Sequence, residues 1–488
     1  MTASINRPLK GCEDVGKVSR NSFPTFSTRR ILIVGLIVVL ILIPQAFAYV
    51  HQQGSHTTTQ TIVSANAKAF IAYASNTGSY LMAAPKGRTW TGLAWSNLEE
   101  LGTSGSTVRW IRAAHCPLTS RYYEKIVVSL SSDGYLTAQV WNGNTWLTAD
   151  NIGEITSAGT AYCSFDVAYE TSSGGAMLVY AVDSTSSIRD LAYRIWDGSS
   201  WSAESYIDDP SHSTNIGYRW VELESNPIST SNEIALIAVD QTNADCNAWI
   251  WDGAGWGNFQ ELENALSGIR DNKCIGLAYE QTSGKAMFGW CYSTDVQFRR
   301  WNGVSWEDEL PSISITTLNV RWLSLKADPQ SNMIMALTID GQNDLNTVLW
   351  DGSAWGSPFE HDDGITHIDK RCADFEWEPS GSKGLIVYSM VSGVVTFKTF
   401  SAPSTWGSVS TVSNAGTHPW IQLRRNPRAV SEDVKIFGAT LNSNDDLWGF
   451  RWNGSTLTFE AQAFTLDTSV TTYECFDLAI RPHMSPLN

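Results

Sequence analysis

A short aromatic motif that recurs along the chain constrains its fold more than any other feature. The motif reads Trp-Asp/Asn-Gly-x-x-Trp, and successive copies start 49 to 55 residues apart. Complete copies begin at Trp141, Trp196, Trp251, Trp301 and Trp350. A copy from Trp452 has Leu457 in place of the second Trp, and a degenerate copy runs from Phe400 to Trp406. A period of this length is typical of β-propeller blades.

The glycine of the motif indicates a tight turn between two strands. Asp-Gly or Asn-Gly supplies the positive φ angles that a two-residue hairpin turn requires. The aromatic residues on either side favour strands and pack across the pair. The repeat glycines are Gly143, Gly198, Gly253, Gly303, Gly352 and Gly454. We therefore interpret the motif as a structural hairpin in each blade.

A second signature precedes each hairpin by about thirty residues. It alternates strictly between two residue types along the chain. The tryptophan type comprises Trp110, Trp220, Trp322 and Trp420, and the cysteine type comprises Cys163, Cys274, Cys372 and Cys475. We expect these cysteines to fill the niche between blades that tryptophan fills in the other copies. The unit of duplication is predicted to be a pair of blades, repeated four times.

The two ends of the repeat region complement each other. The copy that begins at Cys475 has room for only one strand before the sequence ends at residue 488. Residues 68–73 align with residues 285–290, which follow the Cys274 strand in their own blade, so they supply a strand that the last copy lacks. Ala84 to Trp90 is matched with Phe400 to Trp406. The sequence thus predicts an all-β, eight-bladed β-propeller in which one blade takes three N-terminal strands and one C-terminal strand. An open solenoid is the alternative, and it would require capping repeats.

An apolar segment precedes the repeats. Residues 31–50 carry no charge and are long enough to span a bilayer, and residues 1–30 form a basic leader that favours a cytoplasmic N-terminus. The segment is read as a transmembrane signal anchor or as a signal peptide cut after Ala48. Residues 51–65 are a linker, and residues 66–488 form the propeller. Both readings place the propeller outside the cytoplasm, either anchored in the membrane or secreted.

Charge and cysteine content restrict the partners of this chain. The net charge of −16 argues against nucleic acid as a partner, because phosphates require a basic face. Of eight cysteines, Cys12 lies in the leader, and the remaining seven cannot all pair internally. Cys116, Cys246 and Cys291 lie off the repeat and are the better candidates for a disulfide with a repeat cysteine.

Metal and catalytic signals are weak in the sequence. The acidic turns 340–344 and 442–446 resemble one arm of a calcium loop, although ordinary hairpin turns favour the same residues. No other cofactor or metal is predicted, and the sequence contains neither G-x-S-x-G nor H-E-x-x-H, so catalytic residues are unassigned. Asp166, Asp374 and Asp477 fall early in cysteine-type first strands, which line the channel of a propeller. Packing or solvation at the strand edge is the favoured explanation for them.

The hairpins resemble the blades of the fungal and bacterial fucose-binding propeller lectins, most clearly over residues 189–201, RDLAYRIWDGSSW. The resemblance implies a sugar held between blades by an Arg, a Glu and an aromatic residue, without assigning these three to positions in this chain. We expect a non-enzymatic surface module for binding or adhesion, with a glycan or a surface protein as its ligand. The alternative is an extracellular glycoside hydrolase or lyase at the channel mouth. A binding module repeats its site residues in several blades, whereas an enzyme concentrates non-repeated polar residues at one end of the ring.

Overall fold

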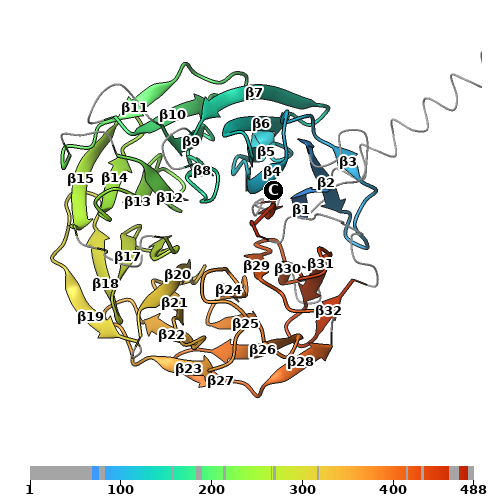
Figure 1. Cartoon of the computed structure of the whole chain (residues 1–488), viewed down its shortest axis with the longest axis vertical. Coiled ribbons are helices and arrows are strands. Elements are labelled where there is room, and N and C mark those ends of the chain that lie inside the picture. The colour runs from blue at the N-terminus through green and yellow to red at the C-terminus, as the bar shows by residue number, and fades with distance from the viewer. Residues whose placement is uncertain are drawn as a thin grey trace, which may run out of the picture. The chain divides into compact units, whose positions relative to one another are not determined.

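The chain folds into a ring of eight antiparallel sheets (Figure 1). This computed structural model describes residues 69–75, 83–155, 159–182, 189–212, 216–264, 266, 271–315, 318–413, 416–429, 434–460 and 472–481. In these ranges the helical residues are confined to 3-10 turns, at Ala83 and in η2 (Thr119–Arg121). The predicted all-β propeller of eight blades is therefore confirmed.

Blades 1 to 4 each contain four strands, which follow one another from the channel outward. Blade 1 consists of β4 (Val108–His115), β5 (Lys125–Ser131), β6 (Tyr135–Trp141) and β7 (Trp146–Glu154). Blade 2 consists of β8 (Phe165–Tyr169), β9 (Ala176–Ala181), β10 (Leu191–Trp196) and β11 (Ser205–Ile207). Blade 3 consists of β12 (Tyr218–Ser225), β13 (Ile234–Asp240), β14 (Cys246–Trp251) and β15 (Trp256–Glu263). Blade 4 consists of β16 (Ile275–Tyr279), β17 (Ala286–Tyr292), β18 (Asp295–Trp301) and β19 (Leu310–Ser314).

Blades 5 to 7 continue the pattern, and blade 6 has its outer strand split in two. Blade 5 consists of β20 (Val320–Ala327), β21 (Ile334–Asp340), β22 (Leu345–Trp350) and β23 (Phe359–Asp362). Blade 6 consists of β24 (Ala373–Trp377), β25 (Lys383–Ser389), β26 (Val394–Ser401), β27 (Thr405–Trp406) and β28 (Ser410–Ser413). Blade 7 consists of β29 (Trp420–Arg425), β30 (Ile436–Leu441), β31 (Leu447–Trp452) and β32 (Leu457–Phe459).

Blade 8 closes the ring by joining strands from the two ends of the repeat region. Its strands are β33 (Phe476–Ile480), β1 (Ala69–Ala74), β2 (Pro85–Trp90) and β3 (Glu99–Glu100). β33 pairs antiparallel with β1, from Tyr73 opposite Phe476 to Ala69 opposite Ile480. The blade therefore has three N-terminal strands and one C-terminal strand, and the pairing removes two sheet edges that would otherwise be free.

The hairpin motif joins the outer strands of the blades. Its glycines adopt φ angles from +91° to +99°, which favours glycine over any residue with a Cβ. The expected match of Ala84–Trp90 with Phe400–Trp406 is wrong. Trp90 instead pairs with Trp95 across a turn at Gly92, where φ is +103°. The segment Trp90-Thr91-Gly92 is thus a copy of the motif in which Thr replaces Asp.

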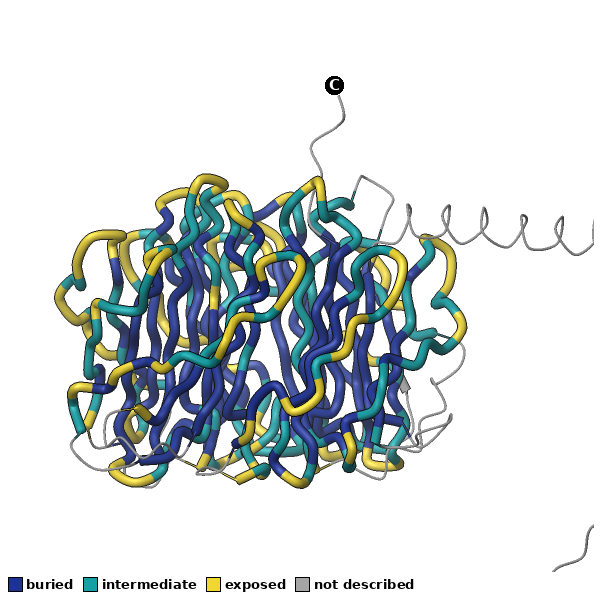
Figure 2. Tube along the Cα trace, turned by 90° about the horizontal axis from the view of Figure 1, so that it is seen from above, coloured by how far each residue is buried: buried dark blue, intermediate teal, exposed yellow. Residues whose placement is uncertain are grey.

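The second strand of each blade forms its core. Every residue of β5, β9, β13 and β21 is buried, and these strands read as nearly continuous apolar runs such as IALIAVD. Each sheet packs between two neighbours, so both faces of its central strands lack solvent. Figure 2 shows buried strand bodies and exposed turns at the two faces of the ring.

The register of one cysteine differs from the expected alternation. In blades 4, 6 and 8 the carbonyl of the repeat cysteine accepts a hydrogen bond from the second strand of its sheet. In blade 2 that carbonyl belongs to Ser164, which accepts from the Ala181 N–H at 2.9 Å. Cys163 precedes the equivalent position by one residue. It therefore aligns with Lys273, Arg371 and Glu474 of the other three blades.

The N-terminal predictions concern a part of the chain that is not described. The leader 1–30, the apolar segment 31–50 and the linker 51–65 all lie outside the described residues. Among the described residues, no helix has the length and hydropathy needed to cross a membrane. The described strands all belong to one compact unit, Val63–Asn488.

Candidate functional site

The first tryptophan of the hairpin is held by a glutamate of the preceding blade. In five junctions between blades the indole Nε1 donates a hydrogen bond to a Glu Oε. The pairs are Trp196 with Glu124 (3.2 Å), Trp251 with Glu170 (2.6 Å), Trp301 with Glu233 (2.9 Å), Trp350 with Glu280 (2.9 Å) and Trp452 with Glu378 (2.9 Å). Carboxylates removed from water require such donors. These tryptophans therefore tie adjacent blades together, and because they are at most 4% exposed, their rings cannot stack on a ligand.

The junction between blades 2 and 3 contains a pocket of about 340 Å³. Its lining residues come from β10, β11 and the loop after β11 on one side, and from β14 and β15 on the other. They are Tyr193, Tyr206, Ile207, Asp208, Pro210, Trp249, Trp256, Gly257, Asn258 and Phe259. Five of these ten side chains are aromatic. A concave, mostly apolar site with a few polar groups is the usual form of a small-ligand site.

Trp249 anchors the inner wall of this pocket. Its ring packs against Phe259 with centroids 5.4 Å apart and against Tyr218 at 5.9 Å. Its Nε1 donates to the backbone oxygen of Asp208 at 2.9 Å. The indole of blade 3 thereby fixes the loop of blade 2 that forms the opposite wall.

The rim of the pocket is open and carries polar groups. Tyr206 is 40% exposed, and the Asp208 carboxylate pairs with Arg189 at 3.0 Å. A Cβ placed on Gly257 would meet no atom within 4 Å, so the space beside that residue is free. Trp256 Nε1 is buried and has no hydrogen-bond partner among the described residues. The pocket therefore offers aromatic faces with polar groups at its rim.

The lining differs from the triad that the lectin resemblance implies. Aromatic residues are present, but neither Arg nor Glu lines this pocket. Arg194 and Glu204 lie on the same blade, 3.9 Å apart, outside the lining. The chemistry for stacking is thus present without the charged pair.

The repeat tryptophans meet at the axis of the ring and do not occupy a niche between blades. Trp110, Trp220, Trp322 and Trp420 form a closed tetrad with centroid distances of 5.7 to 6.2 Å and edge-to-face geometry. Four residues from alternate blades in mutual contact must enclose the axis. They lie near the starts of their strands, so the tetrad closes the channel at that end. The strand register places Cys274, Cys372 and Cys475 at the position equivalent to these tryptophans, as predicted. The expectation that both residue types fill one niche between blades is wrong, because the tryptophans meet at the axis.

Beyond the tetrad lies a cavity of about 480 Å³ lined by charged side chains. Most of these side chains form ion pairs across neighbouring first strands. The pairs include Arg112 with Glu474 (3.1 Å), Lys273 with Glu222 (2.8 Å), Arg424 with Asp477 (3.1 Å) and Arg425 with Glu376 (3.4 Å). These residues are not repeated from blade to blade, in contrast to the hairpins.

Two carboxyl groups of the channel lack a basic partner within ion-pair distance among the described residues. Burial raises the pKa of Asp166 to about 6, and Arg112 acts in the opposite direction. Glu224 is exposed to the channel, where partial desolvation raises its pKa to about 7 against the opposing charge of Lys326. Both groups therefore hold protons more readily than ordinary carboxyl groups do.

The three aspartates singled out in the sequence link first strands of adjacent blades. Asp166 accepts from the Leu223 N–H at 2.9 Å, and Asp374 accepts from the Leu423 N–H at 2.8 Å. Asp477 accepts from the Ala113 N–H at 2.8 Å. In blade 4 the equivalent residue is Gly276, which has no side chain to make the bond.

The seven cysteines of the described residues are buried and unbridged. The candidates Cys116, Cys246 and Cys291 therefore form no disulfide with a repeat cysteine. Cys291 lies beside the repeat cysteine Cys274. Burial and the hydrogen bond between the two thiol groups raise the pKa of the Cys291 thiol. Cys274 itself donates to the Val320 backbone oxygen at 3.2 Å, which places it between blades 4 and 5.

The two acidic turns considered for calcium use their side chains internally. Asp340 Oδ1 accepts from the N–H groups of Gln342 (2.8 Å) and Asp344 (3.1 Å). Asn442 Oδ1 likewise accepts from two N–H groups of its own turn. Both are side-chain-capped hairpin turns. In the described part of the chain, neither belongs to a group of three ligand side chains with the spacing of a metal site.

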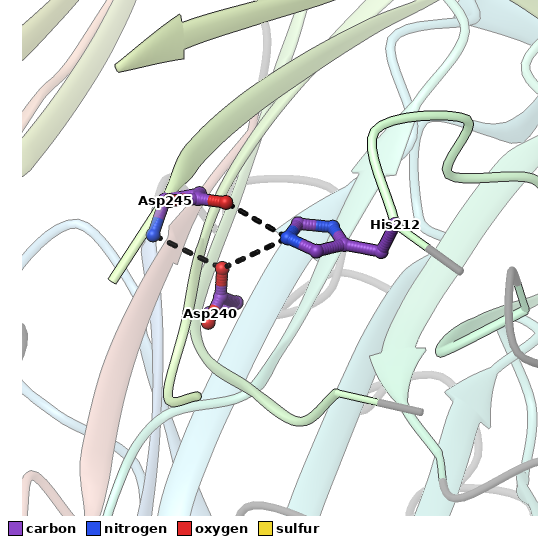
Figure 3. A group of neighbouring side chains, drawn as sticks. All are labelled: His212, Asp240 and Asp245. Carbon is purple, nitrogen blue, oxygen red and sulfur yellow. Dashed lines mark hydrogen bonds and ion pairs between the residues drawn. The ribbon is translucent and has the colours of Figure 1, made fainter. Parts of the chain in front are cut away.

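A third turn of the same kind, 240–245 in blade 3, lies against a histidine. His212 Nε2 is 2.8 Å from Asp245 Oδ2 and 3.9 Å from Asp240 Oδ2 (Figure 3). Burial alone lowers the pKa of His212, but the hydrogen bond and charge of Asp209, with Asp240, raise it above its usual value. Burial and Asp240 raise the pKa of Asp245 to about 6. No sequence pattern indicated this group, because His212 lies outside the repeat.

Comparisons with known proteins return the propeller fold. No family model and no curated protein matches the sequence. The BP39L lectin of Burkholderia pseudomallei is 11% identical, with a TM-score of 0.53 over 73% of this chain and 98% of that chain. The six-bladed, fucose-recognising lectin of Aleuria aurantia is 14% identical, with a TM-score of 0.39 over 63% of this chain and 97% of that one. At such identities the likeness to BP39L shows the fold alone.

Proposed function

We propose that this propeller is a non-enzymatic carbohydrate-binding module, and that its glycan pocket lies between blades 2 and 3. The open pocket lined by five aromatic side chains carries this proposal. Sugars present apolar C–H faces that pack on aromatic rings, while their hydroxyl groups require hydrogen-bond partners. The exposed side chains of Tyr206 and Asp208 supply both kinds of contact.

The pocket also differs from the repeated Trp–Glu pairs in being accessible. The hairpin tryptophan at this junction, Trp251, is committed to Glu170, whereas Tyr206 and Gly257 face open space. The fold that BP39L shares with this chain belongs there to a lectin, which is consistent with the proposal. We further propose that the module is displayed outside the cytoplasm. That placement rests on the basic leader and the apolar segment 31–50 alone.

A glycan array probed with the full chain tests the proposal. We expect binding to at least one glycan class, and we expect Tyr206→Ala to weaken that binding by about fivefold or more, as stacking contacts are worth about 1 kcal/mol or more. Tyr206 is 40% exposed, so its loss leaves the core intact.

Tyr292→Ala is the matched control for this experiment. Tyr292 is a similarly exposed tyrosine, at 44%, and it lies on β17 of blade 4. Its loss is expected to leave glycan binding unchanged. Absence of binding to every glycan, or equal losses from both substitutions, would contradict the proposal.

A second candidate is a glycoside hydrolase or lyase in the channel. The observation that favours it is the pair of protonatable carboxyl groups, Asp166 and Glu224, in a cavity open at one end. A carboxyl group with a raised pKa is suited to act as a general acid. Glu224→Gln would then abolish turnover of a panel of aryl glycosides while leaving the array signal intact. If the wild-type chain cleaves none of them, this candidate is excluded for that substrate class.

A further inference from the structure

The loop after β11 and the turn between β13 and β14 bring four ligand-type side chains together. Asp209 is buried and sits behind His212, with Asp209 Oδ2 2.9 Å from Nδ1 of the ring. Asp209 also accepts from the Tyr218 hydroxyl and from the Ser211 N–H, so its position is fixed by two further donors. With Nδ1 held in this way, Nε2 of His212 points at Asp240 and Asp245 (Figure 3).

The two aspartates of the turn differ in how their carboxylates are held. Asp240 is fully buried, and its Oδ1 accepts from the Asn243 N–H at 2.7 Å, while its Oδ2 accepts from the Asp245 N–H at 3.0 Å. Asp245 is 5% exposed, and its Oδ1 is buried with no hydrogen-bond partner among the described residues. A buried carboxylate oxygen without a partner is costly unless something else binds it.

The charge of the group is not balanced by the protein. Three carboxylates surround one imidazole, and the described residues place no Lys or Arg within ion-pair distance of Asp209, Asp240 or Asp245. Even with His212 protonated, two negative charges remain in a poorly solvated place. A bound cation would remove that imbalance.

We propose that His212 Nε2, Asp240 Oδ2 and the Asp245 carboxylate bind one divalent transition-metal ion, with Zn²⁺ as the best fit, and that Asp209 orients the imidazole. These three kinds of ligand atom lie within 4.8 Å of one another. Zinc–ligand bonds of about 2.0–2.1 Å in a tetrahedron put ligand atoms about 3.3 Å apart. The distances of 2.8 and 3.9 Å from Nε2 to the two carboxylates bracket that value.

The ligand set also decides between cations. Calcium takes oxygen ligands, whereas an imidazole nitrogen suits zinc and its first-row neighbours. A carboxylate that accepts from the other ring nitrogen of a metal-bound histidine is a common arrangement in zinc sites. Three protein ligands leave one position of the ion for water or an incoming group.

The ion would connect blade 2 to blade 3 at the junction that holds the aromatic pocket. Asp208 and Pro210, which line that pocket, flank Asp209 in the same loop. The metal proposal stands on the geometry of the four side chains and does not depend on glycan binding.

Equilibrium dialysis of the full chain against Zn²⁺ at neutral pH, followed by elemental analysis, tests the proposal. We expect about one zinc ion per chain. His212→Ala is expected to weaken binding more than 100-fold, and Asp209→Asn by about 10- to 100-fold through loss of orientation. If His212→Ala misfolds by circular dichroism, Asp209→Asn and Asp245→Asn carry the test.

Asp344→Asn is the matched control, because Asp344 closes the equivalent turn of blade 5, which belongs to no such metal-type group among the described residues. Zinc retention is expected to be unchanged by it. Absorption of the Co²⁺-loaded chain separates the proposed nitrogen and oxygen ligands from the buried thiols. A thiolate-to-cobalt charge-transfer band, no retained zinc, or equal retention by His212→Ala and wild type would overturn the proposal.

Discussion

The junction between blades 2 and 3 and the junction between blades 4 and 5 are built from equivalent parts. Each has a hairpin tryptophan bonded to a glutamate of the preceding blade, Trp251 with Glu170 and Trp350 with Glu280. They differ in the ring contact beside that pair. Phe298 and Trp355 stack at 4.0 Å with an interplanar angle of 28°, whereas the equivalent Tyr193 and Trp256 lie 6.4 Å apart at 73°.

The difference shows that some hairpin residues hold the blades together, whereas other residues of the same hairpins determine whether a pocket is present. The first tryptophan and its glutamate are common to both junctions. Two ring positions decide whether the space between the blades is filled or open. One is the residue three before the first hairpin tryptophan, Tyr193 in blade 2 and Phe298 in blade 4. The other is the second hairpin tryptophan of the next blade, Trp256 or Trp355. Trp249 adds to the contrast, because Val348 stands at its position in blade 5 and has no donor to fix a neighbouring loop.

The largest expected effect comes from opening the closed junction. Phe298 is 1% exposed, and Phe298→Ala is expected to lower the free energy of unfolding by about 3–5 kcal/mol, because it leaves a cavity against Trp355. Tyr193→Ala removes a ring that already borders empty space and should cost less. Denaturant unfolding of both variants measures the difference, and equal losses would show that the two junctions are packed alike.

The shared Trp–Glu pair is expected to give the next largest effect. Trp251→Phe and Trp350→Phe each remove one donor from a buried carboxylate, at a cost of about 1–3 kcal/mol in unfolding free energy. Glu280 keeps Arg300 at 3.3 Å, so the Trp350 substitution should be the milder of the two. Thermal unfolding followed by tryptophan fluorescence measures both, and the reverse order would show that Arg300 does not compensate.

Filling the open junction should weaken glycan binding without unfolding the blade. Gly257→Leu places a side chain in the pocket, where a Cβ meets nothing within 4 Å, and should weaken glycan binding by at least about tenfold, or 1.4 kcal/mol. Gly356→Leu, at the equivalent position of blade 5, is the control and should leave the affinity unchanged. Titration of the glycan identified on the array measures both variants. Unchanged affinity in Gly257→Leu would place the glycan elsewhere.

The smallest effect is expected from removing the hydroxyl group of Tyr193, which makes this position identical in the two junctions. Tyr193→Phe gives blade 2 the residue that blade 4 carries, and stability should change by no more than about 0.5 kcal/mol. We expect the affinity for the glycan to fall by only a few fold, since Trp249 and the loop it anchors keep the pocket open. Complete loss of binding would mean that the Tyr193 hydroxyl, and not the geometry of the junction, determines recognition.

The fold was predictable because its determinants are local. Turn chemistry at the Asp-Gly and Asn-Gly steps and a regular period are enough to infer eight blades and their closure. The hairpin at Trp90 was missed because Thr91 stands where the other copies have Asp or Asn. The one-residue shift at Cys163 was missed because only strand pairing reveals it.

The candidate sites were not predictable, because each depends on contacts between blades. The glutamates that bind the hairpin tryptophans lie 68 to 81 residues away from them in the chain. In the sequence, Trp249 and Phe259 do not differ from other aromatic strand residues. They line a pocket only because the loop of blade 2 lies opposite them. His212 is separated by 33 residues from Asp245, and its loop has no counterpart in the repeat that would draw attention to it.

The tryptophan tetrad sets a rule of parity for the evolution of this ring. Its four indoles come from every second blade and touch in a closed cycle, so each contact requires a blade of the other type between two tryptophan blades. Gain or loss of a single blade would set two blades of one type side by side and break the cycle. Gain or loss of a pair would leave a cycle of a different size. The tetrad therefore favours growth of this chain by duplication of blade pairs. It also favours a ring of eight blades, because eight alternating blades provide the four indoles that close the axis.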